Sequence, residues 1–187
     1  MAEAGQRGDP VHVALLRGIN VGGRNTLRMA DLAGVFEAAG CRDVRTYIQS
    51  GNVLFGAGPD LARRIPALVA ERLAVDLGLA VPVVVRSARQ LRAILDANPY
   101  LAEGADVAHL HVGFLAGRPT PARIARLDPQ RSPPDRFVVL GREIHLHCPN
   151  GVARSKLTNA WFDRVLQTTC TVRNGRTVLR LLELADR

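Results

Sequence analysis

The stretch VRTYIQSGNVLF, residues 44–55, decides the fold that the sequence predicts. Two runs rich in β-branched and aromatic residues, 44–49 and 52–55, lie on either side of Ser50-Gly51, a pair typical of tight turns. The pattern predicts a β-hairpin. A hairpin with a strand and a helix before it, and a helix and a strand after it, is the centre of a split β-α-β unit.

The segments around the hairpin fit such a unit. Before it, apolar residues at helical spacing from Leu32 to Ala39 predict a helix over 29–39 that ends at Gly40. The other elements expected in this half are a strand over 11–18, a helix over 60–78, a strand over 81–85 and a helix over 87–98 with Ser87 as its cap.

The second half repeats this order of elements. It predicts a strand over 109–117, a short helix over 120–127, a hairpin over 136–148, a helix over 155–166, a strand over 169–173 and a helix over 174–185 capped by Asn174. We therefore expect an α+β protein of two ferredoxin-like (split β-α-β) subdomains packed as one compact body. The expected division is a disordered N-terminus over 1–10, a first subdomain over 11–98 and a second over 99–187.

Composition favours anionic partners and argues against a membrane protein. Of 187 residues, 24 are Arg and only one is Lys, and the net charge is +8. A bias toward arginine weakens any conclusion from total charge, but basicity still favours phosphates or nucleic acid. The sequence shows no leader-like apolar run and no stretch near the roughly 20 apolar residues that span a bilayer. We expect a soluble, cytoplasmic protein.

The cysteines and histidines do not predict a metal centre or a disulfide framework. Cys41, Cys148 and Cys170 are odd in number and widely separated, which favours small core residues. Histidines alternate at 109 and 111 and again at 145 and 147, so two pairs on one sheet face would suit a metal. Apolar residues between them favour solvated or hydrogen-bonded imidazoles instead, and we expect neither a metal nor a cofactor.

The stretch LLRGINVGGRNTLRM, residues 15–29, is the first candidate site. Glycines at a junction between a strand and a helix let a phosphate or carboxylate approach backbone N–H groups, and arginines add charged donors. The same residues also fit a purely structural loop, in which the asparagines bond the backbone and the arginines cover the sheet. The candidate residues here are Arg17, Asn20, Gly22, Gly23, Arg24 and Arg28.

Two stretches of the second half are the other candidates. In NGVARSKLTN, Ser155 precedes Lys156, the single lysine, at an expected helix start. In TVRNGRTV, Arg173, Asn174 and Arg176 surround another helix start. Capping and solvation explain both stretches adequately, and a nucleophilic serine activated by lysine is only a guess. The alternative is that these residues converge with the first stretch on one anionic ligand.

Two long stretches carry a resemblance to a known family. VALLRGINVGGRNTLRMADLAGVFEAAGCRDVRTYIQSGNVLF, with IHLHCPNGVARSKLTNAWFDRVLQTTCTVRNGRTVLRLLELA, resembles an uncharacterised bacterial family catalogued as domain of unknown function 1697. The resemblance implies an α+β fold with ferredoxin-like parts, and it brings no activity, cofactor or catalytic residue. The family pattern usually has tryptophan after Arg-Asn near the end, where this chain has Gly175.

The function we expect is a binding module for a phosphorylated or other anionic ligand, either a small molecule or nucleic-acid phosphates. Two alternatives remain: an enzyme acting on a small phosphorylated metabolite, and a protein-protein interaction module. The sequence has only eight aromatic residues, and this small number disfavours a surface on which bases stack. A nucleic acid would therefore be bound through its phosphates. The ligand, any reaction and the oligomeric state are left open.

Overall fold

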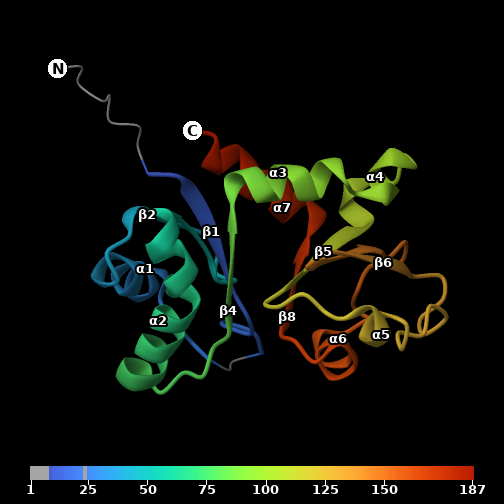
Figure 1. The fold of residues 1–187 in the computed structure, drawn as a ribbon, viewed down its shortest axis with the longest axis horizontal. Helices are drawn as coiled ribbons and strands as arrows, with labels where there is room; N and C mark the ends of the chain where they lie inside the picture. The colour runs from blue at the N-terminus through green and yellow to red at the C-terminus, as the bar shows by residue number, and fades with distance from the viewer. Residues whose placement is uncertain (1–8, 23–24) are drawn as a thin grey trace. The chain divides into compact units, whose positions relative to one another are not determined.

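The computed structural model describes residues 9–22 and 25–187. The chain divides into two compact units, Met1–Ala88 and Arg89–Arg187, and each is described here by itself (Figure 1). Sequence analysis placed the division at residue 98, after the helix that the structure assigns to the second unit. The expectation of disorder falls mostly on residues 1–8, outside the described residues. Asp9 contacts Arg42 in an ion pair, and the Pro10 carbonyl accepts from the Ala57 N–H.

The first unit is a four-stranded antiparallel sheet with two helices. Its elements are β1 (Val11–Leu16), α1 (Met29–Ala38), β2 (Arg42–Tyr47), β3 (Asn52–Gly56), α2 (Pro59–Leu77) and β4 (Val83–Ser87). The strand order is β2-β3-β1-β4. Strands β1 and β2, joined through α1, are separated by β3, and this is the split β-α-β arrangement that the hairpin predicted.

The second unit has the same topology with extra helices. Its elements are α3 (Ala88–Asp96), α4 (Pro99–Ala102), η1 (Val107–His109), β5 (Leu110–Leu115), α5 (Pro121–Ile124), β6 (Arg136–Leu140), β7 (Glu143–His147), α6 (Asn159–Leu166), β8 (Cys170–Asn174) and α7 (Gly175–Ala185). The strand order β6-β7-β5-β8 matches that of the first unit. The expected α+β fold with two ferredoxin-like subdomains is confirmed.

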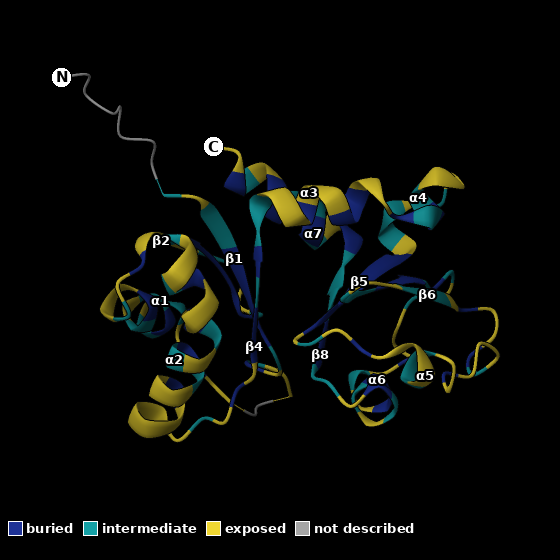
Figure 2. Cartoon of the chain, viewed as in Figure 1, coloured by how far each residue is buried: buried dark blue, intermediate teal, exposed yellow. Residues whose placement is uncertain are grey.

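Each sheet buries one face under its own helices. In the first unit, Ala14 and Leu16 of β1 pack with Phe36 of α1 and with Ile65 and Val69 of α2. In the second unit, the corresponding cluster joins strands β5–β8 to Trp161 and Phe162 of α6. The helices show the matching amphipathic pattern, with one side buried and the other exposed (Figure 2). Apolar side chains recur every second residue on the strands and about every 3.6 residues on the helices, so each element presents one apolar face to the other.

Strand register shows that the two units repeat at the level of residues, which the order of elements alone did not reveal. VHVALLRG over 11–18 corresponds to LHVGFLAG over 110–117, and VRSAR over 85–89 corresponds to VRNGR over 172–176. In the sheets, Val13 pairs with Arg86 and Val112 pairs with Arg173. The two arginines also make the same type of contact within their own units, since each donates from Nη1 to the carbonyl of the residue before it.

Several element boundaries differ from the expectation, and two of them have a local reason. The helix expected over 155–166 begins at Asn159, because the Thr158 hydroxyl accepts from the Trp161 N–H as the cap. Strand 81–85 is shifted to Val83–Ser87 by its pairing with β1. Helix α2, expected over 60–78, continues through Pro66 and packs its inner side on the sheet. No described helix is long and apolar enough to span a membrane.

Candidate functional site

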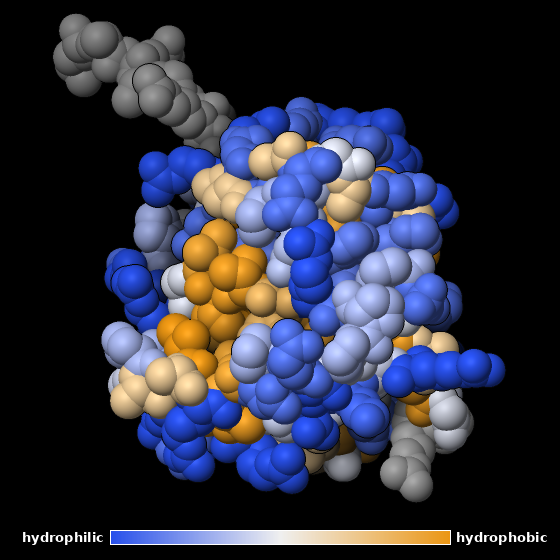
Figure 3. All heavy atoms as spheres, turned by 90° about the vertical axis from the view of Figure 1, so that its right-hand side faces the viewer, coloured by the Kyte–Doolittle hydropathy of each residue, from blue (hydrophilic) through white to orange (hydrophobic). Residues whose placement is uncertain are grey.

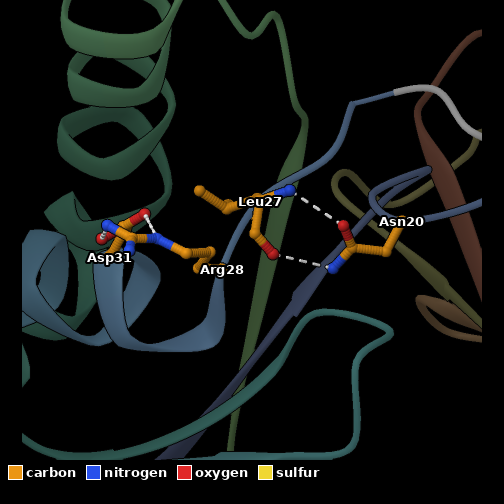
Figure 4. Close-up of polar contacts among 4 residues, drawn as sticks. All are labelled: Asn20, Leu27, Arg28 and Asp31. Carbon is orange, nitrogen blue, oxygen red and sulfur yellow. Dashed lines mark hydrogen bonds and ion pairs between the residues drawn. The ribbon is translucent and has the colours of Figure 1, made fainter.

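In the loop between β1 and α1, Asn20 connects three parts of the backbone. It has a left-handed backbone with φ 54°. Its side chain donates to the Leu27 carbonyl at 2.9 Å and accepts from the Leu27 N–H at 2.8 Å (Figure 4). It also donates to the Gln49 carbonyl at 2.8 Å. Asn25 donates to the Gly18 carbonyl. These contacts give Asn20 a structural role in closing the loop, as one of the two sequence-based interpretations proposed.

The other candidate residues of this loop differ in how far they are available to a ligand. Arg28 donates two hydrogen bonds to the Asp31 carboxylate, from Nε and from Nη2, each 2.8 Å long (Figure 4). Its guanidinium is therefore already paired. The ion pair holds the pKa of Asp31 below its usual value. Arg17 is half-buried, and its N–H donates to the Pro82 carbonyl. Gly22 has φ +58° and open space around it, while Gly23 and Arg24 lie outside the described residues.

The junction between β8 and α7 is built around Asn174 and Arg173. The Asn174 side chain accepts from the Arg176 N–H as the helix cap, and it donates to the Ala108 carbonyl and to Nε2 of His111. Arg173 donates from Nη1 to the Thr171 hydroxyl, and burial lowers the pKa of Arg173 to about 10. It therefore remains charged at neutral pH. The side chains of Asn174 and Arg173 thus both bond within their own unit.

Glycine at position 175, in place of the tryptophan of the family pattern, has a steric explanation in this chain. A Cβ on Gly175 would lie 2.8 Å from the Val107 carbonyl oxygen and 3.2 Å from that of Leu110. Backbone oxygens cannot move aside cheaply at such distances. The start of α7 therefore packs directly on η1 and β5 with no side chain between them.

Lys156 is held by its backbone and exposed at its side chain. Its N–H donates to the Ser132 hydroxyl at 3.0 Å, and its carbonyl accepts from Nε of Arg131 at 3.1 Å. Ser155 uses its hydroxyl to accept from the Leu157 N–H, which leaves capping of α6 to Thr158. The ammonium group makes no hydrogen bond or ion pair with any residue in the described part of the chain.

The histidines form no metal site, for a reason of register. His111 pairs with Leu146, whereas His145 pairs with Val112, so the two lie on opposite faces of the sheet. Among the described residues there is no cluster of three His, Cys, Asp or Glu that could hold a metal. The expectation that these imidazoles are solvated or hydrogen-bonded is wrong for His145, which is 1 % exposed with no partner for Nδ1.

Contacts around Lys156 belong to a larger basic surface of the second unit. Segments 117–132 and 154–168 lie side by side, joined by the Gly117 N–H to the Thr168 hydroxyl, by Arg123 to Gln167 and by Arg131 and Ser132 to Lys156. Helices α5 and α6 belong to these segments and lie together in Figure 1. We call the exposed cations on the two segments the basic strip: Arg118, Arg126, Arg154, Lys156 and Arg164.

The cations of the basic strip form no ion pairs with the carboxylates near them in the sequence. None of its five side chains forms an ion pair or hydrogen bond within the described residues. Neighbouring acids bond elsewhere: Asp128 accepts from the Gln130 N–H, Asp135 from the Ser132 hydroxyl and Asp163 from the Cys170 N–H. By contrast, arginines 28, 42, 63 and 72 of the first unit form ion pairs with Asp.

Sequence reasoning missed most of the basic strip. The segment LAGRPTPARIARLDPQRSPPDR, residues 115–136, is rich in proline and arginine and was interpreted as a connection rather than core, so only Lys156 of the strip was a candidate. The sequence feature that could have indicated the strip is the net charge of each half of the chain. The unit Arg89–Arg187 holds 15 basic and nine acidic residues, so it carries +6 of the total +8. On the face in Figure 3, which is the side of Figure 1 where α5 lies, hydrophilic side chains surround a broad apolar patch.

Fold and sequence together define the class of this protein. Two split β-α-β units in one chain make it a double ferredoxin-like α+β protein. The chain belongs to the family described as "Protein of unknown function (DUF1697)", whose model matches residues 10–145. This confirms the resemblance that the sequence showed.

The fold is shared with a solved bacterial structure. The conserved bacterial protein SP0830 from Streptococcus pneumoniae is similar with a TM-score of 0.71 and 22 % identity, covering 94 % of this chain and 98 % of that one. At this identity the likeness concerns the fold. No curated protein is similar enough to match the chain.

Proposed function

We propose that the protein is a binding module for a phosphorylated or other anionic ligand, and that the second unit binds this ligand through the basic strip. The observation that carries the proposal is Lys156, an exposed ammonium without a partner on a backbone fixed at both its N–H and its carbonyl. A fixed backbone lowers the entropy lost when the side chain binds an anion.

Two features support an anion rather than another ligand. The cations of the strip are unpaired, so binding a phosphate replaces water and counterions and breaks no existing ion pair. Arginine is a planar fork that matches phosphate oxygens, while lysine adds a compact charge. The opening loop is not part of this proposal, because Asn20 and Arg28 already bond to their own unit. A contribution from Gly22, Gly23 and Arg24 stays a prediction.

The test uses inorganic tripolyphosphate as the probe and isothermal titration calorimetry at about 50 mM salt. We expect binding by the natural chain, and an affinity at least about 5-fold weaker in the double variant Arg126→Ala, Lys156→Ala, since each lost cation removes roughly 0.5–1 kcal/mol. Arg89→Ala is the matched control, because Arg89 is an exposed, unpaired arginine on α3 outside the strip. Absence of binding, or an equal loss in the control, would contradict the proposal.

A further inference from the structure

We infer that the second unit pairs with a second copy of this chain through the outer edge of β6, as two antiparallel strands related by a two-fold axis at Val138. This inference goes beyond the proposed function and does not depend on it. In the order β6-β7-β5-β8, β6 is an edge strand, and its main contacts with the described elements are those to β7. An open edge presents backbone groups to which another strand can bond.

The backbone groups of Phe137 and Val139 point outward from this edge. The Cys148 N–H donates to the His109 carbonyl on the β5 side, so every second residue counted back from Cys148 bonds to β5. The residues between them bond to β6, where they pair with residues 136, 138 and 140. The N–H and carbonyl groups of Phe137 and Val139 are therefore left over, and they make no hydrogen bond within the described residues.

The equivalent edge of the first unit is protected, whereas β6 is not. Strand β2 carries the exposed residues Arg42, Asp43 and Arg45, and its register shifts between Arg42 and Arg45. Charges and bulges are features that keep another strand from pairing with an edge. Strand β6 pairs in an unbroken register, residues 137–139 are apolar, and Leu140 is 41 % exposed. The middle of β6 therefore lacks each of these protective features.

A register centred on Val138 makes the edge complementary to itself. With Val138 facing its counterpart, Phe137 faces Val139, and both of these pairs exchange two hydrogen bonds. All the outward N–H and carbonyl groups of both strands are then satisfied. Arg136 faces Leu140 in this register, so no arginine lies directly opposite another. A second copy therefore fits the edge without a repulsive pair.

The two neighbouring registers lack free backbone groups. A shift of two residues in one direction would pair Val139 with Asp135, whose N–H already donates to the Ser132 carbonyl at 2.7 Å. A shift in the other direction would pair Phe137 with Gly141, which lies in the turn after β6 with φ 66°. The register centred on Val138 is therefore the one in which the groups on both strands are extended and available.

Sedimentation velocity of the full chain tests the pairing, at about 5 to 500 µM to cover weak association through a small interface. We expect the mass to rise with concentration from that of one chain, 20.2 kDa, toward twice this value. Val139→Pro removes an outward N–H that the sheet does not use, and it should keep the chain monomeric. Thr46→Pro is the matched control, because the N–H of Thr46 points outward from β2 by the same alternation.

Cysteine cross-linking tests the register without a proline variant. Val138→Cys places two thiols at the two-fold axis, in a pair whose Cα atoms lie about 4.5 Å apart, which a disulfide can span. Leu140→Cys is the matched control, since Leu140 is more exposed than Val138 but lies opposite Arg136. Under mild oxidation we expect at least about 5-fold more covalent dimer from Val138→Cys. The three natural cysteines are buried and should contribute no cross-link.

Dimers that form with concentration, disappear in Val139→Pro and cross-link preferentially at position 138 support the inference. A chain that stays monomeric at the highest concentration overturns it and leaves the edge to a strand of another protein. Dimers that persist in Val139→Pro, or equal cross-linking at positions 138 and 140, also overturn it. Circular dichroism shows whether Val139→Pro folds, and if it does not, the cross-linking result decides.

Discussion

Asn20 shows how one side chain can hold a loop that looks, in sequence, like a ligand site. It satisfies the Leu27 N–H and two carbonyls that would otherwise lack partners at the base of the loop. Its left-handed backbone also suits asparagine better than most other residues. The interpretation of Asn20 as an anion-binding residue and its interpretation as a loop residue predict different results on mutation.

Asn20→Ala should lower the free energy of unfolding by roughly 2–3 kcal/mol, because about 1 kcal/mol is lost for each hydrogen bond. Asn20→Asp keeps the acceptor and loses the donor, so an intermediate loss is expected. Urea unfolding followed by circular dichroism measures both. Tripolyphosphate affinity of the folded variants should stay unchanged, and a loss of affinity without a loss of stability would assign Asn20 to the ligand instead.

His145 couples stability to pH. Burial lowers the pKa of His145 from 6.5, and the charge of Glu143 opposes this only in part. Below pH 6.5 the unfolded chain therefore takes up a proton that the folded chain resists, so stability present above that pH falls as the pH drops. One proton contributes at most about 1.4 kcal/mol per pH unit.

His145→Leu should reduce the loss of stability between pH 7.5 and 5.5, measured by urea unfolding at several pH values. Because Nδ1 has no partner, the variant should be at least as stable as the natural chain at pH 7.5. The exposed His109 supplies the control His109→Gln, which should keep the natural pH profile. Identical profiles for His145→Leu and the natural chain would contradict this assignment. The pKa values of His12 and His111 are also lowered by burial, so some pH dependence remains.

At the scale of elements, two glycines in helices have opposite requirements. Gly175 begins α7 against the carbonyls of Val107 and Leu110, whereas Gly34 lies inside α1 with nothing within 4 Å of its missing Cβ. Sequence alone treats both as weak helix residues. Only the atoms around each position show that alanine fits at one of them and not at the other.

Gly175→Ala should destabilise the protein by about 1–3 kcal/mol, the usual cost of overpacking against rigid neighbours. Gly34→Ala should stabilise it by up to about 1 kcal/mol, since alanine favours the helix. Thermal unfolding of both variants gives the comparison. Equal shifts of the same sign would show that α7 does not pack on η1 as described.

Strands were the elements that the sequence predicted best. The two β-rich runs on either side of Ser50-Gly51 predicted the hairpin, and the apolar runs predicted β1 and β5, because buried strands must be apolar. The faces of individual histidines were not predictable, since they depend on which residue lies opposite in the neighbouring strand. Helix starts were also uncertain, as shown by α6, which begins after Thr158 rather than at Ser155.

At the scale of the whole molecule, charge is distributed unevenly. The second unit carries +6 and the first +2, and the carboxylates near the basic strip bond to backbone and hydroxyl groups. Unpaired like charges repel each other at low salt, and salt screens them over a Debye length that shrinks from about 30 Å at 0.01 M to 10 Å at 0.1 M.

The melting temperature should therefore rise when sodium chloride increases from 10 to 100 mM, by an amount that corresponds to roughly 1 kcal/mol or less. The double variant Arg126→Ala, Arg164→Ala should show a smaller rise, and Arg64→Ala, an exposed arginine of α2, serves as the control in the first unit. Differential scanning fluorimetry measures all three. A fall in melting temperature with salt would mean that ion pairs dominate instead.

The sequence by itself determined the order of the elements, the α+β class and the two ferredoxin-like units, because hydrophobic period and turn residues act over a few positions along the chain. The family followed from the resemblance of two long stretches to known sequences. Only the tertiary structure showed that Lys156 lies beside Arg131 and Ser132, that segments 117–132 and 154–168 form one basic strip and that His145 is buried. Such contacts join residues far apart in sequence, and strand register and packing decide them, which no local pattern records.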